Sequence, residues 1–187
     1  MGTVSESAAD VFRTSGDRDG AGRPVLWYGA QPAWQIDLER DAQRAHGLHL
    51  RREQGIGVSW RRSTGWLAYH HDGLNVPGRR DTVPVTVAFF EDPPYDTYGI
   101  APENYPRIWA DCGAVSPHRM SDQAPCLYYP WSAVEQRWTA ADGLLPLLNL
   151  VRDHLYFEHY WRLTGGQRRG QWLGGEAAHG VPDVMAS

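Results

Sequence analysis

Lysine is absent from this 187-residue chain, whose 18 basic side chains are all arginines. A GC-rich coding bias is the simpler explanation. The functional alternative is that an enzyme forming isopeptide bonds on lysine amines cannot modify its own side chains if it carries no lysine. Positive charge is not in excess either, because the formal net charge is -4. Binding along nucleic-acid phosphates needs clustered positive charge, so the composition argues against a nucleic-acid partner.

Cysteine is also scarce, since Cys112 and Cys126 are the only two in the sequence. Two cysteines are too few for a disulfide framework in a chain of this size. No segment has the pattern of a secretory signal, and no apolar run approaches the length of a membrane span. We therefore expect a cytoplasmic protein without a membrane partner, in which both thiols stay free. A glycine-rich phosphate loop is missing too, so the chain is not expected to activate a carboxyl group with ATP.

The order of predicted elements favours an α+β fold in one domain. Residues 1–23 are rich in Gly, Ser, Asp and Ala and lack periodicity, which predicts a mobile N-terminal tail. The domain is expected over 24–180, with a short tail over 181–187. A first helix is predicted from about 33 to 46, because a proline precedes it and a glycine follows it.

Strand and turn signals follow this helix and predict an antiparallel meander. Gly65–Tyr69 is one expected strand, with Asp72-Gly73 as a turn signal after it. Val83–Phe89 alternates between valine or phenylalanine and smaller or polar residues, which is the period of a strand with one buried face. The segment 93–106 cannot be regular structure, because its prolines lack an N–H donor and restrict their neighbours. Residues 107–110 form a last short strand.

The clearest predicted helix lies near the C-terminus. Apolar residues recur there at helical spacing, at Leu144, Leu147, Leu148, Val151 and Leu155. We expect Asp142 to cap its start and Gly165-Gly166 to end it. Pro146 falls in the first turn, where a missing N–H is tolerated. Further apolar residues predict that the helix is buried on more than one side.

Cys126 lies between the proline-rich region and this helix, in the stretch Pro125-Cys126-Leu127-Tyr128-Tyr129-Pro130. Nucleophilic thiols that carry an acyl group as a thioester occur at the mouths of such irregular loops. A structural cysteine more often lies inside an apolar run. The alternative for Cys126 is a small buried residue without chemistry. Cys112 directly follows a predicted strand and is interpreted as structural.

A thiol in this setting suggests acyl transfer. A thiolate attacks an acyl donor and holds the acyl group as a thioester, which an amine then takes. A reference thiol has a pKa of about 8.5 and a lysine amine one of about 10.4, so both need local help to lose a proton. His118, His179 and Asp122 are the candidates for orienting or deprotonating the amine. Tyr128 and Tyr129 are candidates for excluding water, which protects a thioester.

Three local matches accompany this order of elements. Cys126-Leu127 is followed by Trp138-Thr139-Ala140, and His118 lies eight residues before the cysteine. The C-terminal region carries Tyr156-Phe157-Glu158 and, further on, Trp172-Leu173-Gly174-Gly175-Glu176 with His179. Over roughly residues 33 to 180 the chain resembles the ubiquitin-conjugating enzyme fold (UBC-like). The likeness is greatest to bacterial members associated with cyclic-oligonucleotide (CBASS-type) antiphage defence. In that family the cysteine carries the thioester, and the histidine belongs to a His-Pro-Asn motif.

The resemblance implies a conjugating enzyme that carries a protein C-terminus on its cysteine and transfers it to an amine. The residues assigned by this expectation are Cys126, His118 and His179 for catalysis, and Gln123, Tyr128 and Trp138 for substrate and oxyanion support. No cofactor and no metal site are implied. The expected partners are a ubiquitin-like modifier or other protein with an activated C-terminus, a separate adenylating enzyme or donor, and a cyclic-oligonucleotide nucleotidyltransferase.

The sequence also departs from the family pattern. The tripeptide Pro117-His118-Arg119 offers no counterpart to the asparagine that supports the oxyanion in eukaryotic relatives. Charge develops on the thioester oxygen in the transition state, so another donor is needed, and Gln123 and backbone amides near Cys126 are the candidates. The spacing from Cys126 to Trp138 is longer than in eukaryotic members, which predicts a larger loop beside the site.

Two other classes of function stay open. The first is a catalytically inactive binding module with the same fold. Partner binding would then survive the loss of Cys126. The second is a metal-dependent or thiol hydrolase that uses Cys112, Cys126, His118 and His179. No pair among these residues has the close spacing typical of a zinc site. Separately, Trp138 is interpreted as a packing residue more readily than as a substrate contact.

Overall fold

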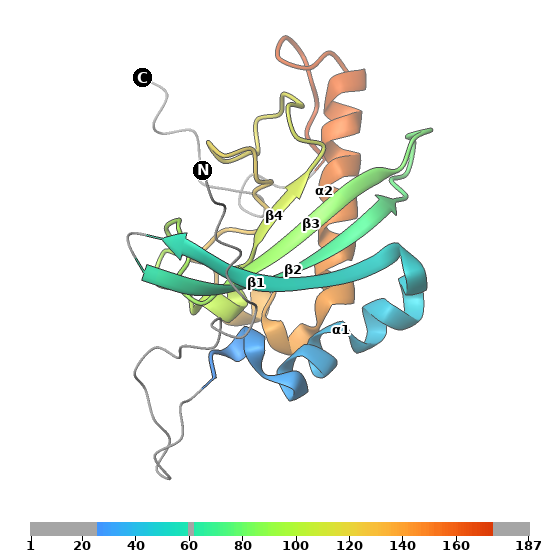
Figure 1. The fold of residues 1–187 in the computed structure, drawn as a ribbon. Helices are drawn as coiled ribbons and strands as arrows, with labels where there is room; N and C mark the ends of the chain where they lie inside the picture. Colours follow the sequence, from blue (N-terminus) through green and yellow to red (C-terminus); the bar gives the residue numbers. More distant parts are fainter. Residues whose placement is uncertain (1–25, 60–61, 174–187) are drawn as a thin grey trace, which may run out of the picture.

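The computed structural model describes residues 26–59 and 62–173. Within these ranges the chain forms an N-terminal helix, a four-stranded antiparallel sheet and a long C-terminal helix, so the predicted α+β class is confirmed (Figure 1). The strands lie in the order β1-β2-β3-β4, each paired with its neighbour in sequence, which makes the sheet the expected meander. The predicted tails over 1–23 and 181–187 lie outside the described residues.

The regular elements are α1 (Pro32–His46), β1 (Leu50–Ser59), β2 (Arg62–Leu74), β3 (Val83–Phe90), β4 (Arg107–Ala110) and α2 (Leu144–Leu163). Short 3-10 turns connect them: η2 (Tyr28–Ala30), η3 (Gly47–His49), η4 (Pro102–Asn104), η5 (Val134–Gln136) and η6 (Ala140–Asp142). The first helix begins and ends as predicted, because Pro32 occupies its first turn and Gly47 adopts a positive φ of 53° at its end. β4 has the predicted bounds.

β3 is the centre of the core. Val83, Val85, Val87 and Phe89 are buried and Pro84 is exposed, as the period of two predicted, but Ala88 on the other face is buried as well. The turn predicted at Asp72-Gly73 is wrong, since both residues lie inside β2. The register shifts between His71 and Leu74, and the N–H of Gly73 donates to Nδ1 of His71 at 3.1 Å. The residues that favour a turn therefore produce a bulge, and the chain reverses after Leu74 instead.

α2 covers one face of the sheet, and α1 lies beside the β1 edge (Figure 1). The buried residues of α2 follow a single stripe: Leu144, Leu147, Leu148, Val151, His154, Leu155, Glu158 and Trp161. The flanking apolar side chains are only partly covered, so the helix is not buried on several sides as expected. Neither of the two α-helices in the described ranges is long and apolar enough to cross a membrane.

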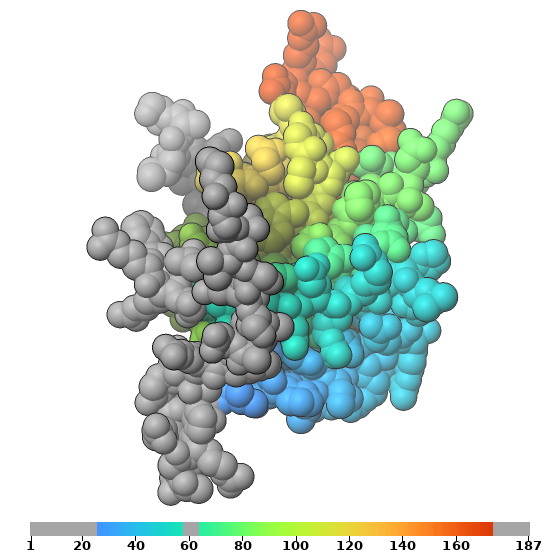
Figure 2. All heavy atoms as spheres, in the orientation of Figure 1, coloured from blue at the N-terminus to red at the C-terminus, as the bar shows by residue number. Residues whose placement is uncertain are grey.

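The start of α2 differs from the prediction. Asp142 does not cap α2 but closes a capping box with Thr139 around the preceding turn η6. Gly143, with a φ of 81°, stands at the N-cap of α2 without a side-chain hydrogen bond. A carboxylate three residues after a threonine caps whichever turn starts there, and here that turn is η6. Figure 2 shows the space-filled molecule, from which the β2–β3 turn (75–82) projects beside the C-terminal end of α2.

Candidate functional site

Residues 118–126 form a small hairpin in the connection from β4 to α2. The N–H of Cys126 donates to the carbonyl of His118 at 2.9 Å, and an isolated bridge pairs Arg119 with Pro125. The N–H of Met120 donates to the carbonyl of Ala124 at 2.8 Å. We name residues 118–126 the cysteine hairpin. It brings together two of the predicted site residues, because His118 and Cys126 lie opposite one another on its two arms.

The thiol of Cys126 is buried, with 8% of the residue exposed. Burial raises the pKa of Cys126 to about 11, and the nearby Arg107 guanidinium only partly offsets this effect. The cysteine therefore does not stand at an open loop mouth as expected, since the hairpin folds it inward. At neutral pH, a thiol with this pKa is ionised in only about one molecule in ten thousand.

A small cavity lies beside the hairpin and has a volume of about 20 Å³. It is lined by Tyr105, Pro106, Arg107, Ile108, Met120, Ala124, Pro125, Leu127 and Tyr128. A cavity of this size holds about one water molecule. This cavity is therefore too small to hold an acyl group.

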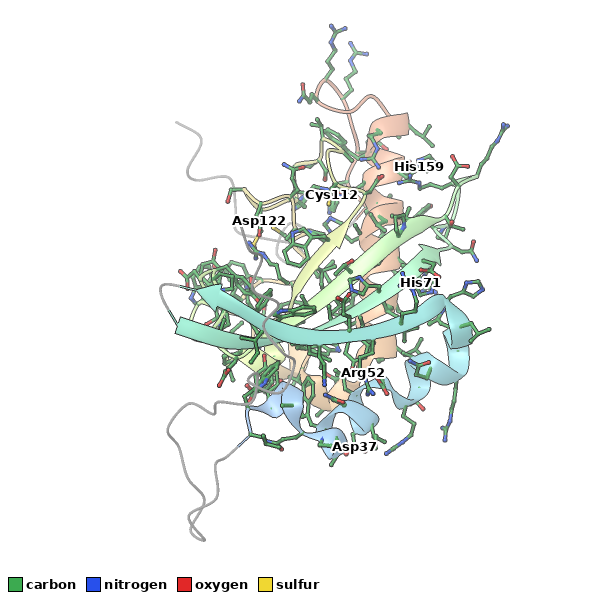
Figure 3. All side chains as sticks on the ribbon, viewed as in Figure 1. Asp37, Arg52, His71, Cys112, Asp122 and His159 are labelled. Atoms are coloured by element: carbon green, nitrogen blue, oxygen red, sulfur yellow. The ribbon has the colours of Figure 1, made fainter. Side chains whose placement is uncertain are left out.

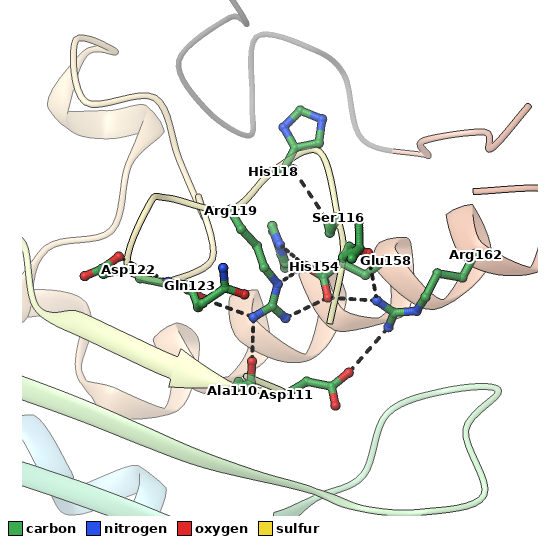
Figure 4. A network of polar contacts seen from close by, with 12 residues as sticks. Ala110, Asp111, Ser116, His118, Arg119, Asp122, Gln123, His154, Glu158 and Arg162 are labelled. Carbon is green, nitrogen blue, oxygen red and sulfur yellow. Dashed lines mark hydrogen bonds and ion pairs between the residues drawn. The ribbon is translucent and has the colours of Figure 1, made fainter. Parts of the chain in front are cut away.

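His118 presents its backbone to Cys126 and its ring to another part of the chain. The imidazole packs against the indole of Trp172, with 4.2 Å between ring centroids. Figure 4 shows the ring directed away from the cluster around Arg119. His118 is therefore part of the cysteine hairpin, and its ring packs against Trp172.

Tyr128 and Trp138 are packing residues in this structure. The hydroxyl of Tyr128 donates to the carbonyl of Asn104 at 3.1 Å, and Nε1 of Trp138 donates to the carbonyl of Gly143 at 2.8 Å. Both side chains are buried in the core. They hold the segments on either side of the loop after Cys126, as the packing interpretation of Trp138 predicted.

The other candidates are distributed around the hairpin. Gln123 is exposed at the hairpin turn with a positive φ of 69°. Asp122 forms an ion pair with Arg107. The carboxylate that was proposed as a base is therefore already bound to a guanidinium. Cys112, interpreted as structural, is exposed. Figure 3 shows Cys112 and Asp122 on the connection beyond the end of β4. His179 lies outside the described residues.

The most buried polar cluster of this region is one that the sequence analysis missed. Nε and Nη2 of Arg119 donate to the two carboxylate oxygens of Glu158 at 2.7 and 2.8 Å. His154 contacts the same carboxylate from one turn earlier in α2, with Nε2 at 3.2 Å. Figure 4 shows this cluster between α2 and the hairpin. The signal was present in the sequence, since a glutamate on the apolar stripe of a buried helix needs a partner.

The contacts among Arg119, His154 and Glu158, together with their burial, set the pKa values of the histidine and the glutamate. Burial alone would raise the pKa of Glu158, but hydrogen bonds from His154 and Arg119 outweigh it and lower this pKa to about 2. Burial lowers the pKa of His154, so this imidazole is neutral at pH 7. The Glu158 carboxylate is therefore surrounded by the guanidinium groups of Arg119 and Arg162 and by the imidazole of His154.

Among residues 26–59 and 62–173, no three His, Cys, Asp or Glu side chains are placed to hold a metal ion. No protein-family model, curated protein or solved structure matches the chain. The arrangement itself is compatible with a UBC-like fold, because a helix, a four-stranded meander, a cysteine-bearing connection and a long helix follow in that order.

Proposed function

We propose that the protein is a ubiquitin-like conjugating enzyme that carries a protein C-terminus as a thioester on Cys126 and transfers it to an amine. The supporting observation is the cysteine hairpin, which pairs Cys126 with His118 between the last strand of a meander and a long helix. Both residues belong to the local matches that carry the resemblance to the bacterial conjugating enzymes. The finer assignment to a defence system follows from that resemblance alone.

The proposed chemistry has two steps. The Cys126 thiol loses its proton, and its sulfur attacks the acyl carbon of an activated C-terminus. A C–S bond forms while the bond to the donor's leaving group breaks, and that group departs with the electron pair. An acceptor amine then attacks the same carbon, so that a C–N bond forms, the thiolate leaves and the amine gives its proton to a base.

The raised pKa of Cys126 suits a carrier better than a rapid nucleophile. A buried thiol is seldom ionised, which slows its loading. Once the thioester has formed, a thiol of high pKa is a poor leaving group, so stray thiols displace it slowly. The burial of Cys126 limits access of water to the same bond. We therefore expect slow loading and a long-lived thioester.

The proposal requires partners that supply activated cargo. An adenylating enzyme or another activated donor delivers the modifier, and a cyclic-oligonucleotide nucleotidyltransferase is the partner implied by a CBASS-type system. We propose a cytoplasmic site of action, where the thiol of Cys126 stays reduced.

A catalytically inactive binding module is the second candidate. The observation in its favour is the burial of Cys126, which leaves 8% of the residue exposed. In that case the cysteine packs as a small apolar residue and the fold serves to hold a partner.

The absence of lysine provides the test. Cys126→Lys places the only lysine of the chain at the proposed attachment site, where an acyl group would be held as a stable amide. Because a buried lysine can unfold the domain, Cys126→Ser serves as a second trap that forms an ester. Cys112→Lys is the matched control, since it offers an exposed lysine elsewhere on the same connection.

Each variant is expressed in the native host with its neighbouring genes, and its adducts are located by intact mass and peptide sequencing. We expect an adduct at residue 126 and none at residue 112. If folded variants stay unmodified at residue 126, transfer on Cys126 is refuted and the binding module is favoured. An adduct at both positions would indicate nonspecific acylation.

A further inference from the structure

The guanidinium of Arg119 joins the cysteine hairpin to two other segments. It makes two hydrogen bonds with Glu158 of α2 at 2.7 and 2.8 Å. Its Nη1 donates to the carbonyl of Ala110, the last residue of β4, at 2.8 Å. The same atom donates to the carbonyl of Gln123 on the other arm of the hairpin, at 2.9 Å (Figure 4). One side chain thus connects a strand, both arms of the hairpin and a helix.

We propose that Arg119, held by Glu158, is a positioning residue that fixes the cysteine hairpin and thereby places Cys126. Arg119 pairs with Pro125 across the hairpin, and Pro125 directly precedes the cysteine. A shift of the arm that carries Arg119 therefore moves Cys126 and the His118 carbonyl that it contacts. The role of Arg119 in catalysis rests on the proposed function, whereas its role in fixing the hairpin rests on the geometry alone.

Glu158 provides a fixed anchor for Arg119. Its side chain is fully buried, and that of Arg119 is 4% exposed. His154 lies one turn before the glutamate and contacts it at 3.2 Å, while Arg162 lies one turn after it, at 3.5 Å. These contacts on both sides hold the carboxylate beside Arg119. The hairpin is consequently tied to the core of the domain and not only to the surface loop.

The chemistry of the pair favours a role in specifying geometry. Replacing a buried ion pair by apolar residues of similar volume often leaves stability unchanged or improves it, so such a pair is weak evidence for stabilisation. An arginine fork fixes direction, because its five N–H groups lie in one plane and bind a carboxylate at two points. Lysine keeps the charge but cannot reproduce the planar set of contacts. Arg119→Lys therefore separates positioning from charge.

The first test measures how often the hairpin opens. In a Cys112→Ser background, the rate at which iodoacetamide alkylates Cys126 reports exposure of the buried thiol. We expect Arg119→Lys to raise this rate about tenfold, through local opening that low urea does not accelerate. Arg52→Lys is the matched control, since Arg52 pairs with Glu39 at 3.0 Å on β1 and α1, away from the hairpin. It is expected to leave the rate unchanged.

A merely structural role predicts a different result for the paired replacement Arg119→Met with Glu158→Leu. An apolar pair can restore the urea midpoint lost in either single variant. It cannot donate to the carbonyls of Ala110 and Gln123, so we expect rapid alkylation of Cys126 to persist. If Arg119→Lys alkylates at the control rate, or if the paired replacement restores both stability and slow alkylation, the positioning role is overturned.

The second test uses loading of Cys126 with a peptide thioester as an already activated donor. We expect Arg119→Lys to lower the maximal loading rate about tenfold without raising the donor concentration needed for half of that rate. If the wild type loads and Arg119→Lys loads at the same rate, the positioning role is refuted and the proposed function stays intact. If the wild type itself does not load, the proposed function fails, and the alkylation rates still decide whether Arg119 fixes the hairpin.

Discussion

The imidazole of His71 hydrogen-bonds to the imidazole of His46, with 3.0 Å between Nε2 and Nδ1. Because the N–H of Gly73 donates to Nδ1 of His71, the proton of His71 is placed on Nε2 and is donated to His46. The contact joins the end of α1 to the bulge of β2. Both rings are neutral in this arrangement, and a proton added to either acceptor nitrogen would break a hydrogen bond.

We expect this pair to make the domain sensitive to acid. Burial lowers the pKa of both histidines, and the neighbouring His49 adds to the effect, while Asp72 partly opposes it for His71. A histidine with a lowered pKa in the folded state stabilises the fold above the unfolded value of about 6.5, and this contribution is lost as the pH falls below that value. The urea midpoint of the wild type should therefore fall between about pH 7.5 and pH 5.5.

His71→Gln should be less stable than the wild type near neutral pH, yet lose less of its stability on acidification. His70→Gln is the control, because His70 contacts Thr86 on the sheet and not the His46 pair. It should keep the acid dependence of the wild type. Equal acid dependence in both variants would show that the His46–His71 contact is not the source.

Leu148 should be essential for the core between α2 and the sheet. Only 1% of the residue is exposed. Leu148→Ala should lower the free energy of unfolding by about 2–5 kcal/mol, and Leu148→Asp should unfold the domain because it buries an unpaired charge. Leu163→Ala in the same helix removes a side chain that is 72% exposed. In chemical denaturation, the unfolding free energy of this control variant should lie within about 0.5 kcal/mol of the wild-type value.

Two glycines of the β1–β2 pair should differ in their tolerance of alanine. A Cβ added at Gly65 would lie 2.4 Å from Nε1 of Trp27, whereas one at Gly57 would lie 3.8 Å from Trp66. Gly65→Ala should displace the Trp27 indole and cost about 1–3 kcal/mol. Gly57→Ala should change the unfolding free energy by much less. Similar losses for both would mean that backbone conformation, and not the close approach of Trp27, controls the effect.

The two thiols should differ in reactivity. Burial raises the pKa of Cys126 to about 11, so its alkylation rate should increase about tenfold for each pH unit between about 7 and 10. Cys112 is exposed and should react first with iodoacetamide at neutral pH. The Cys112→Ser and Cys126→Ser variants allow each rate to be measured alone. A rate for Cys126 that is already constant above about pH 8 would contradict the raised pKa.

Periodicity and terminal residues were sufficient to predict most of the fold. The valine alternation of β3 and the leucine spacing of α2 predicted buried faces that the structure contains. β1 was not delimited, because its residues 51–54 are exposed on the edge of the sheet and show no alternation of burial. The bulge at Asp72-Gly73 was mistaken for a turn, since turn residues also permit an irregularity within a strand.

The candidate site was predicted less completely. Cys126 in its proline-flanked stretch, with His118 eight residues before it, directed the prediction to this connection, and the structure pairs the two residues in one hairpin. The sequence left open whether the thiol is buried, because burial depends on how the hairpin packs against β4. The Arg119–Glu158 contact spans 39 positions of the sequence. No local pattern encodes such a contact, and only the charged residue on the apolar stripe of α2 hinted at it.

The meander has a consequence for the order of folding. Its strands pair only with their neighbours along the chain, so the sheet can form from contacts of low sequence separation. The link between the cysteine hairpin and α2 closes a longer loop, which carries a greater entropic cost. We therefore expect the sheet to assemble first and the hairpin to dock last. In native-state hydrogen exchange, the amide of Cys126 should then exchange through a local opening while the core stays folded. The free energy of this opening should be lower than that for the amides at the centre of β3.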